Sequence, residues 1–455
     1  MQSLFLHYQT IVNSDYNNLA GYLKECYMVY HADHNERCMY ASGLKVCNDS
    51  NDVLMLQKSD LCYESVNVTK GYKNLYCVDC EECSDVYFCK NCMNCSDCIG
   101  CTNLRNQKYC IENVQYTKEE YEAKKKELDL SNYQNVRNYK KVAQSNWLKY
   151  PVKYMHSRQN VNSTGDYVFN SRNTLDSFEM VGAEDCRYCQ FASTKTSKDC
   201  YDYTEYGENV EMVYETLLLG DGGANIRFTT QAVSNLRDLE YCYGVANASY
   251  LFGCIGVRAK QYCILNKQYT KEEYEELVPK IRKHMNEMPY VDAHGREYKY
   301  GEFFPINENV ARGKGYAWKN VEEKAYVPTK SWKDLPNTLA ETDDSITREI
   351  ILCEDWDTNQ NNAMNHNCTK AYKILPQELT FYKRMNIPIP RKCPNGRHND
   401  RTKFRNPIIF NEQVCMCELG NHDHEGKCIE QFKTSYTKEG KEIVFCEKCY
   451  QAEVF

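Results

Sequence analysis

The residues best placed to do chemistry are cysteines and histidines near the C-terminus. Closely spaced thiols occur in three groups, Cys415-Met-Cys417, Cys428 and Cys446-Glu-Lys-Cys449. Paired thiols on short turns are the ligands that tetrahedral zinc prefers. We expect a structural zinc site formed by four of them: Cys417, Cys428, Cys446 and Cys449. His422 or His424 could replace one sulfur, and reduced or disulfide-bonded cysteines are the alternative.

A second, more dispersed set of thiols precedes this group. Cys353, Cys368 and Cys393 are spread over about forty residues, with His398 or His366 available as a fourth ligand. Three thiols and one imidazole are also a common ligand set for structural zinc. The sequence therefore predicts one or two structural zinc ions.

A basic stretch lies between the two sets of thiols. Asp400 is the one acidic residue in this stretch. Its eight basic residues are Lys383, Arg384, Arg391, Lys392, Arg397, Arg401, Lys403 and Arg405. A basic patch beside a zinc site is typical of contacts to nucleic-acid phosphates. The alternative is a solvated loop that balances acidic neighbours.

The first hundred residues use cysteine differently. All thirteen cysteines between Cys26 and Cys110 lie on one three-residue period. Neither a helix nor a strand keeps this period, whereas a narrow solenoid can turn one small side chain inward per three residues. Valine and alanine fill other positions of the same period, so the thiols are interpreted as slim core residues. Disulfides across the core and thiolate-bound metal are the alternatives.

The chain also contains a duplication. The segment QYTKEEYE occurs at 115–122 and again at 268–275. The second half repeats the three-residue period, with one phase over 165–192, another over 236–263 and one shift near 192–200. We therefore expect two solenoids, at 26–112 and 160–265. The separations of the cysteines predict both 12-residue and 15-residue coils. In each copy a Thr-Lys-Glu-Glu capping box predicts a helix, over 118–128 and 271–286, that covers the end of the stack.

These patterns predict a mainly β protein with two tandem, narrow, right-handed β-solenoids, helical caps and a zinc-ribbon-like C-terminal module. The expected domains are the first solenoid with its cap (1–130), the second with its cap (131–286), an irregular connector (287–345) and the zinc module (346–455).

Composition limits the classes of function. The 455 residues carry a net charge of −7, so the chain as a whole is not a typical nucleic-acid binder. The N-terminus has no basic start and no long apolar segment, from which we expect no signal peptide and a cytoplasmic protein with reduced thiols. No apolar stretch is long enough to span a membrane. A Gly-rich phosphate loop, G-x-S-x-G and H-E-x-x-H are all absent.

Several longer segments resemble an uncharacterised bacterial family of cysteine-rich repeat proteins framed by zinc-ribbon modules. They are LRNQKYCIENVQYTKEEYE, VRAKQYCILNKQYTKEEYEELVPKI, LPQELTFYKRMNIPIPRKCPNGRHNDR and TSYTKEGKEIVFCEKCYQAEV. The resemblance covers most of the chain, implies zinc at Cys446 and Cys449, and adds no catalytic residues.

The chain departs from this family in two respects. The N-terminal zinc ribbon has no counterpart, so the resemblance predicts that the chain begins inside the repeat region. The family patterns Cys-Pro-x-Cys and Cys-x-x-Cys read Cys393-Pro-Asn-Gly396 and Cys353-Glu-Asp-Trp356 here. The resemblance implies that the Cys353 site is degenerate or completed by histidine.

We therefore expect a non-enzymatic binding or scaffold protein that presents an extended solenoid surface to a macromolecular partner. Nucleic-acid binding through the basic zinc module, and a thiol-based metal or redox protein, are the two rival hypotheses. An enzyme with its site in a groove between the solenoids is a further alternative.

Overall fold

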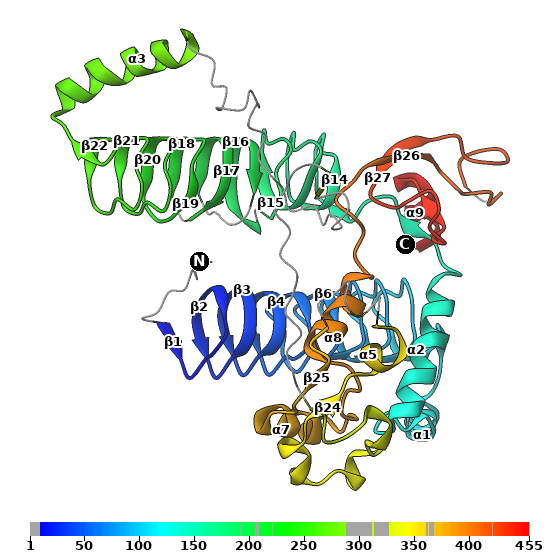
Figure 1. The fold of residues 1–455 in the computed structure, drawn as a ribbon. Coiled ribbons are helices and arrows are strands. Elements are labelled where there is room, and N and C mark those ends of the chain that lie inside the picture. The colour runs from blue at the N-terminus through cyan, green and yellow to red at the C-terminus, as the bar shows by residue number, and fades with distance from the viewer. Residues whose placement is uncertain are drawn as a thin grey trace.

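The protein is mainly β, and most of its strands pair in parallel. The computed structural model describes residues 10–191, 193–204, 209–220, 222–287, 312–313, 327–360, 363, 368–420 and 422–454. The parallel strands form two stacks that lie one beside the other in Figure 1. We call residues 11–115 the first stack and residues 157–268 the second stack.

The first stack is built from coils of constant length. Each parallel strand pairs with the next at a constant 12-residue offset, as in Val29 with Ala41 and Cys98 with Cys110. Its strands are β1 (Ile11–Val12), β2 (Asn18–Lys24), β3 (Tyr27–Glu36), β4 (Met39–Asn48), β5 (Leu54–Gln57), β6 (Val66–Thr69), β7 (Tyr72–Leu75), β8 (Ser84–Tyr87), β9 (Ser96–Ile99), β10 (Lys108–Ile111) and the antiparallel β11 (Val114–Gln115).

The three-residue period has a backbone cause. From residue 13 to residue 112, every third residue has a positive φ, so a 12-residue coil has four sides of three residues. This conformation costs most side chains about 1–2 kcal/mol but is tolerated by Asn, Asp and Gly. Many of these positions are accordingly Asn or Asp, and their side chains bond from coil to coil. Asn91 Nδ2 donates to Asn103 Oδ1 at 2.7 Å, and Asn94 Nδ2 donates to Asn106 Oδ1 at 2.6 Å.

The position that follows each positive-φ residue faces the core. The thirteen cysteines at these positions are buried, free and part of one cluster with the inward valines and alanines. Cys77 Sγ donates to the carbonyls of Leu75 (3.3 Å) and Val86 (3.4 Å). Ser65 occupies an equivalent position, and its Oγ donates to two carbonyls in the same way. The prediction that these thiols fill the core is confirmed.

The expectation of 15-residue coils in the first stack was wrong. Its parallel pairs all have the 12-residue offset across the described strands. More widely spaced cysteines, such as Cys47 and Cys62, are separated by one full coil and one further three-residue side. The spacing between two cysteines therefore depends on the length of the coil and on which of its four sides each cysteine occupies.

The second stack has coils of unequal length. Its strands are β13 (Ser157–Arg158), β14 (Gly165–Phe169), β15 (Ser177–Glu184), β16 (Ser193–Thr204), β17 (Val210–Leu219), β18 (Gly223–Arg227), β19 (Thr230–Ala232), β20 (Leu236–Glu240), β21 (Ser249–Phe252), β22 (Gln261–Ile264) and β23 (Lys267–Gln268). Paired residues are 11 apart at first (Ser157 with Val168), then 12, then 14 (Ala183 with Ser197), 13 and again 12.

The period of the second stack therefore shifts several times, whereas the sequence predicted one shift near 192–200. The longer coils surround larger core residues. The side chain of Tyr203, for example, is fully buried in this core.

A helix covers the C-terminal end of each stack. α1 (Lys118–Leu128) and α3 (Lys271–Glu287) begin at the expected capping boxes, in which Thr117 pairs with Glu120 and Thr270 with Glu273. α2 (Tyr133–Trp147) was expected to belong to the second solenoid. It packs instead on the first stack, where Trp147 Nε1 donates to the carbonyl of Phe88 at 3.0 Å.

The segment after α3 returns to the first stack. Residues 288–311 and 314–326 of the expected connector lie outside the described residues. The elements that follow are η2 (Trp332–Asp334), η3 (Leu339–Glu341), η4 (Asp344–Arg348), β24 (Ile351–Leu352), α5 (Glu354–Thr358), β25 (Ala371–Tyr372), α7 (Pro376–Met385) and α8 (Pro394–Thr402). Leu379, Phe381 and Tyr382 of α7 share one apolar core with Tyr63 of the first stack.

The last elements form a small module beside both stacks (Figure 1). β26 (Asn411–Val414) and β27 (Gln431–Thr434) form an antiparallel hairpin, and β28 (Val444–Phe445) leads into α9 (Glu447–Val454). β28 pairs in parallel with β12 (Val152–Lys153), which connects the two stacks. We call residues 406–454 the C-terminal module. Within the described chain, no helix has the length and apolar character needed to cross a bilayer.

Candidate metal centre

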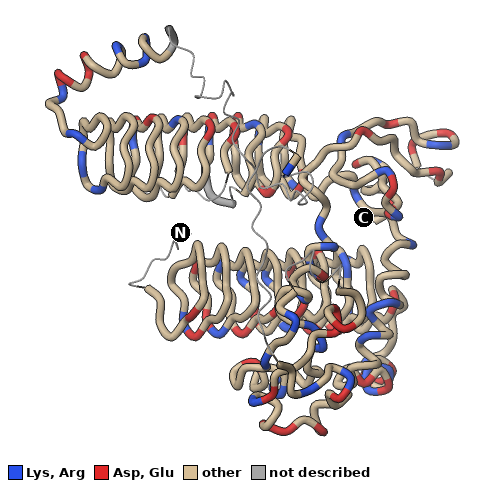
Figure 2. The backbone as a smooth tube through the Cα atoms, in the orientation of Figure 1, with Lys and Arg blue, Asp and Glu red and all other residues tan. Residues whose placement is uncertain are grey.

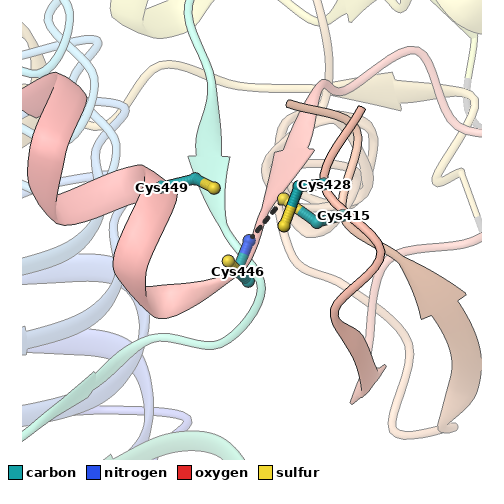
Figure 3. A group of neighbouring side chains, drawn as sticks. All are labelled: Cys415, Cys428, Cys446 and Cys449. Atoms are coloured by element: carbon teal, nitrogen blue, oxygen red, sulfur yellow. Dashed lines mark hydrogen bonds between the residues drawn. The ribbon is translucent and has the colours of Figure 1, made fainter. Parts of the chain in front are cut away.

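Four thiols of the C-terminal module face a common point (Figure 3). The sulfur atoms of Cys415, Cys428, Cys446 and Cys449 all lie within 4.8 Å of one another. All four side chains are buried. This four-thiol group could hold a metal ion.

Local structure explains why these four thiols converge. Cys415 follows β26 and Cys428 precedes β27, so both lie at the end of the hairpin where its loop joins the two strands. The amide of Cys415 donates to the carbonyl of Glu430 at 2.9 Å, which continues the ladder. Cys446 follows β28, and Cys449 lies in the first turn of α9. Two thiols thus come from the hairpin and two from a strand-to-helix turn.

The hydrogen bonds of this group favour thiolate. The backbone amide of Cys446 donates to Cys415 Sγ at 3.2 Å, the bond drawn in Figure 3. Burial opposes ionisation of Cys428, yet a backbone amide at Glu430 and the neighbouring thiols lower its pKa overall. Burial raises the pKa of Cys415 to about 11. An N–H donor stabilises the charged form of a sulfur, so these bonds oppose the effect of burial on the thiols.

The structure differs from the sequence prediction at one position. Cys415 occupies the place that was expected for Cys417. The side chain of Cys417 belongs to a neighbouring group with His422, His424 and Cys449. Side chains two residues apart on a strand point to the same face, so the pattern alone allows either thiol. The position at which β26 ends decides between them, and the sequence does not reveal it.

The three thiols expected for a second site also come together. Cys353, Cys368 and Cys393 place their sulfurs within 4.8 Å of one another, with 3.5 Å between the last two. Cys353 and Cys393 are the N-cap residues of α5 and α8, and the amide of Gly396 donates to Cys393 Sγ at 3.4 Å. The thiols of Cys353 and Cys368 lower the pKa of Cys393. Helix N-termini favour thiolates, so this group could also hold a metal ion.

The fourth ligand expected for this site does not join it. His398 lies on α8 with an exposed side chain and is not part of the group. His366, the other histidine considered, lies outside the described residues.

The basic stretch does not form the expected continuous surface. Arg391, Arg397 and Arg401 are buried. Arg397 and Arg401 both bind Asp52 of the first stack, and Arg397 also contacts Glu378 Oε1 at 3.2 Å. These guanidinium groups attach α8 to the first stack instead of facing solvent.

The remaining basic residues of the stretch also have partners within the protein. Lys383 pairs with Asp344, Arg384 with Asp49, Lys392 with Asp355 and Asp400, Lys403 with Asp400 and Arg405 with Glu179; Arg391 donates to the carbonyls of Leu335 and Pro336. Figure 2 shows basic and acidic positions close together around the first stack and the segments packed on it. The stretch therefore balances acidic neighbours, as the alternative interpretation held, although its central arginines are not solvated.

A groove of about 860 Å³ lies where the two stacks meet the C-terminal module. His156, which lines it, lies between two carboxylates, 2.8 Å from Asp166 and 3.5 Å from Asp79. Burial would lower the pKa of His156, but Asp166 and Asp79 raise it to about 10. A histidine that stays protonated at neutral pH is an ion-pair partner and a poor general base. This triad links both stacks, and no linear motif connects its members.

No family model matches the chain, and no curated protein matches it.

Proposed function

We propose that the protein is a zinc-containing, non-enzymatic scaffold that presents one face of its second stack to an extended macromolecule. In this proposal both stacks are narrow β-solenoids and the C-terminal module is a zinc ribbon. The constant 12-residue offset and the inward side chain at every third position support the solenoid. Thiols on a hairpin and on a strand-to-helix turn support the ribbon.

The donor set supports zinc as the metal. Four thiolates are soft ligands that select zinc or iron–sulfur centres over Mg²⁺ or Ca²⁺. A tetrahedron with Zn–S bonds of about 2.3 Å has sulfur–sulfur edges of about 3.8 Å. Sulfurs within 4.8 Å of one another need only a small contraction to reach it. Four protein ligands complete the tetrahedron, so the proposed ion is structural and leaves no position for a substrate.

The observation that carries the binding proposal is a row of exposed aromatic rings on the second stack. Tyr214, Phe228 and Tyr241 are 40%, 36% and 41% exposed and lie on three successive coils. Their ring centroids are 5.4 Å and 4.8 Å apart. We call these three residues the aromatic row.

The aromatic row has the geometry of a linear binding surface. Its rings follow the stack axis, along which neighbouring strands are about 4.8 Å apart. At the next coil Phe252 is covered by α3, through Tyr274 and Val278. The row is thus covered at one end and open along its length. Rigid rings at regular spacing suit a polymer that runs parallel to the stack.

Binding to defined polymers tests this proposal. The full chain is titrated with a soluble glucan, a polyproline peptide and single-stranded RNA, and binding is followed by calorimetry. We expect one polymer to bind. Changing Tyr214, Phe228 and Tyr241 together to Ser should weaken that binding about tenfold or more, because each stacked ring contributes about 0.5–1.5 kcal/mol.

The matched control is Tyr72→Ser, which removes a similarly exposed ring from the first stack. It should leave binding unchanged. The scaffold proposal fails if none of the three polymers binds, or if the row variant binds as tightly as the unmodified chain. RNA binding that weakens steeply with salt, and that is equally tight in the row variant and the unmodified chain, would support the nucleic-acid hypothesis instead.

A further inference from the structure

A second group of metal-type ligands adjoins the four-thiol group and shares one residue with it. Ligand atoms of Cys417, His422, His424 and Cys449 lie within 4.8 Å of one another. Cys449 therefore belongs to both groups. Cys417 is fully buried, and the His422 side chain is only 2% exposed.

The two imidazoles are held in the orientations that metal ligands adopt. A ligating histidine usually donates its other ring N–H to a carbonyl or a carboxylate. His424 Nδ1 is 2.8 Å from the carbonyl oxygen of Gly426, so its Nε2 is the nitrogen left for a metal. His424 Nε2 is a buried atom without a hydrogen-bond partner in the described structure.

His422 has the complementary arrangement. Its Nδ1 lies 3.1 Å from Cys417 Sγ, inside the group, while its Nε2 points toward the carboxylate of Glu453 at 3.7 Å. Nε2 has no hydrogen bond among the described residues, and Glu453 is its nearest ionic partner. Metal at Nδ1 would fix the proton on Nε2, facing that carboxylate.

We propose that the C-terminal module binds two zinc ions joined by the thiolate of Cys449. One ion takes Cys415, Cys428, Cys446 and Cys449; the other takes Cys449, Cys417, His422 and His424. This inference extends the zinc part of the proposed function and does not depend on the aromatic row.

Charge balance favours the second ion. One zinc with four thiolates leaves two excess negative charges in a buried site, beside the buried thiol of Cys417. A second zinc with one further thiolate reduces that excess to one. Bound cations are the largest local charges in such sites, so this change stabilises the cluster of sulfurs.

Metal counting on single variants of the full chain tests the proposal. Zinc per chain is measured after gel filtration for the unmodified protein and for Cys417→Ala, His424→Ala and the control His31→Ala, an exposed histidine of the first stack. We expect each of the first two variants to lose one zinc and the control to lose none. Because differences are compared, zinc at the Cys353 group does not affect the result.

Cadmium-113 NMR of the unmodified, ¹¹³Cd-loaded chain gives a readout that is independent of folding defects in the variants. A bridging Cys449 thiolate should couple two cadmium resonances, one from an all-sulfur site and one from a site with two nitrogens. Zinc unchanged in Cys417→Ala, or one uncoupled all-sulfur resonance from the module, would overturn the second site and leave the first intact. If neither the unmodified chain nor Cys428→Ser contains zinc, the module does not bind zinc and the zinc part of the proposed function is wrong as well.

Discussion

Two populations of cysteine in this protein are equally buried but differ in the direction of their hydrogen bonds. In the first stack the hydrogen bonds of the thiols run from Sγ to carbonyl oxygens, as at Cys38 and Cys77. In the metal-type groups, backbone amides donate to sulfur, as from Cys446 to Cys415 and from Gly396 to Cys393. A carbonyl acceptor retains the thiol proton, whereas an amide donor favours its loss.

The comparison explains why one residue type serves two purposes. Burial raises the pKa of Cys47 and Cys62 to about 12, which keeps these stack thiols neutral. Where stack thiols touch, as at Cys80 and Cys83, their contact lowers one pKa and raises the other. Even there, the stack thiols do not form a group of three or more metal-type ligands among the described residues. Between the first stack and the metal-type groups, the direction of the hydrogen bonds separates the thiols better than burial does. In the second stack, Cys254 both donates to carbonyls and accepts from the amide of Asn266.

The largest expected difference is in metal content. Cys446→Ser should abolish zinc at the four-thiol group and unfold the C-terminal module, because structural zinc contributes about 10–16 kcal/mol of apparent binding free energy. Zinc analysis and limited proteolysis measure the two effects. Cys62→Ser in the first stack is the matched control and should keep full zinc. Equal zinc content in the two variants would show that the two regions do not differ in metal binding.

The pH dependence should also differ between the two regions. The pKa of Cys62 is about 12 in the folded protein and about 8.5 in an unfolded chain. Its stabilising contribution is therefore complete below about pH 8.5 and is lost as pH rises toward 12, by about 1.4 kcal/mol per pKa unit.

Zinc thiolates respond in the opposite direction, because protons displace the metal as pH falls. Thiolate ultraviolet absorbance during alkaline unfolding checks the stack, and zinc release to a chromophoric chelator during acidification checks the module. Ionisation of Cys62 near pH 8.5 in the folded protein, seen as the thiolate absorbance that Cys62→Ser loses, would contradict this prediction.

The smallest expected effect is on the free energy of unfolding, when one inward-facing residue of the first stack is replaced by another small residue. Cys62→Val should change the free energy of unfolding by less than about 1.5 kcal/mol, since valine fills equivalent positions at Val53 and Val68. Cys62→Ser should be similarly mild, because Ser65 makes the carbonyl bonds that a hydroxyl needs at such a position. Chemical denaturation measures both. A loss of several kcal/mol in either variant would mean that the thiol has a specific partner.

Local patterns allowed much of the fold to be predicted. The three-residue period identified the inward thiols, and the boxes at Thr117 and Thr270 located α1 and α3. The positive φ at every third residue could have been inferred from the Asn and Asp at those positions, such as Asn91 and Asp97. These features depend on neighbours along the chain or one coil away.

Features that depend on distant contacts could not be predicted. Arg397 and Arg401 looked like a surface patch, because their partner Asp52 is 345 and 349 residues away in the sequence. The choice of Cys415 over Cys417 depends on the register of the β26–β27 hairpin. His156 gave no signal, since its carboxylate partners come from different stacks.

Anomalous diffraction at the zinc absorption edge can show which of the 27 cysteines bind metal, because it locates the ion itself. We expect peaks between Cys415, Cys428, Cys446 and Cys449, and none inside the first stack. A peak among the sulfurs of residues 77–101 would show that the stack thiols bind metal and would contradict this expectation.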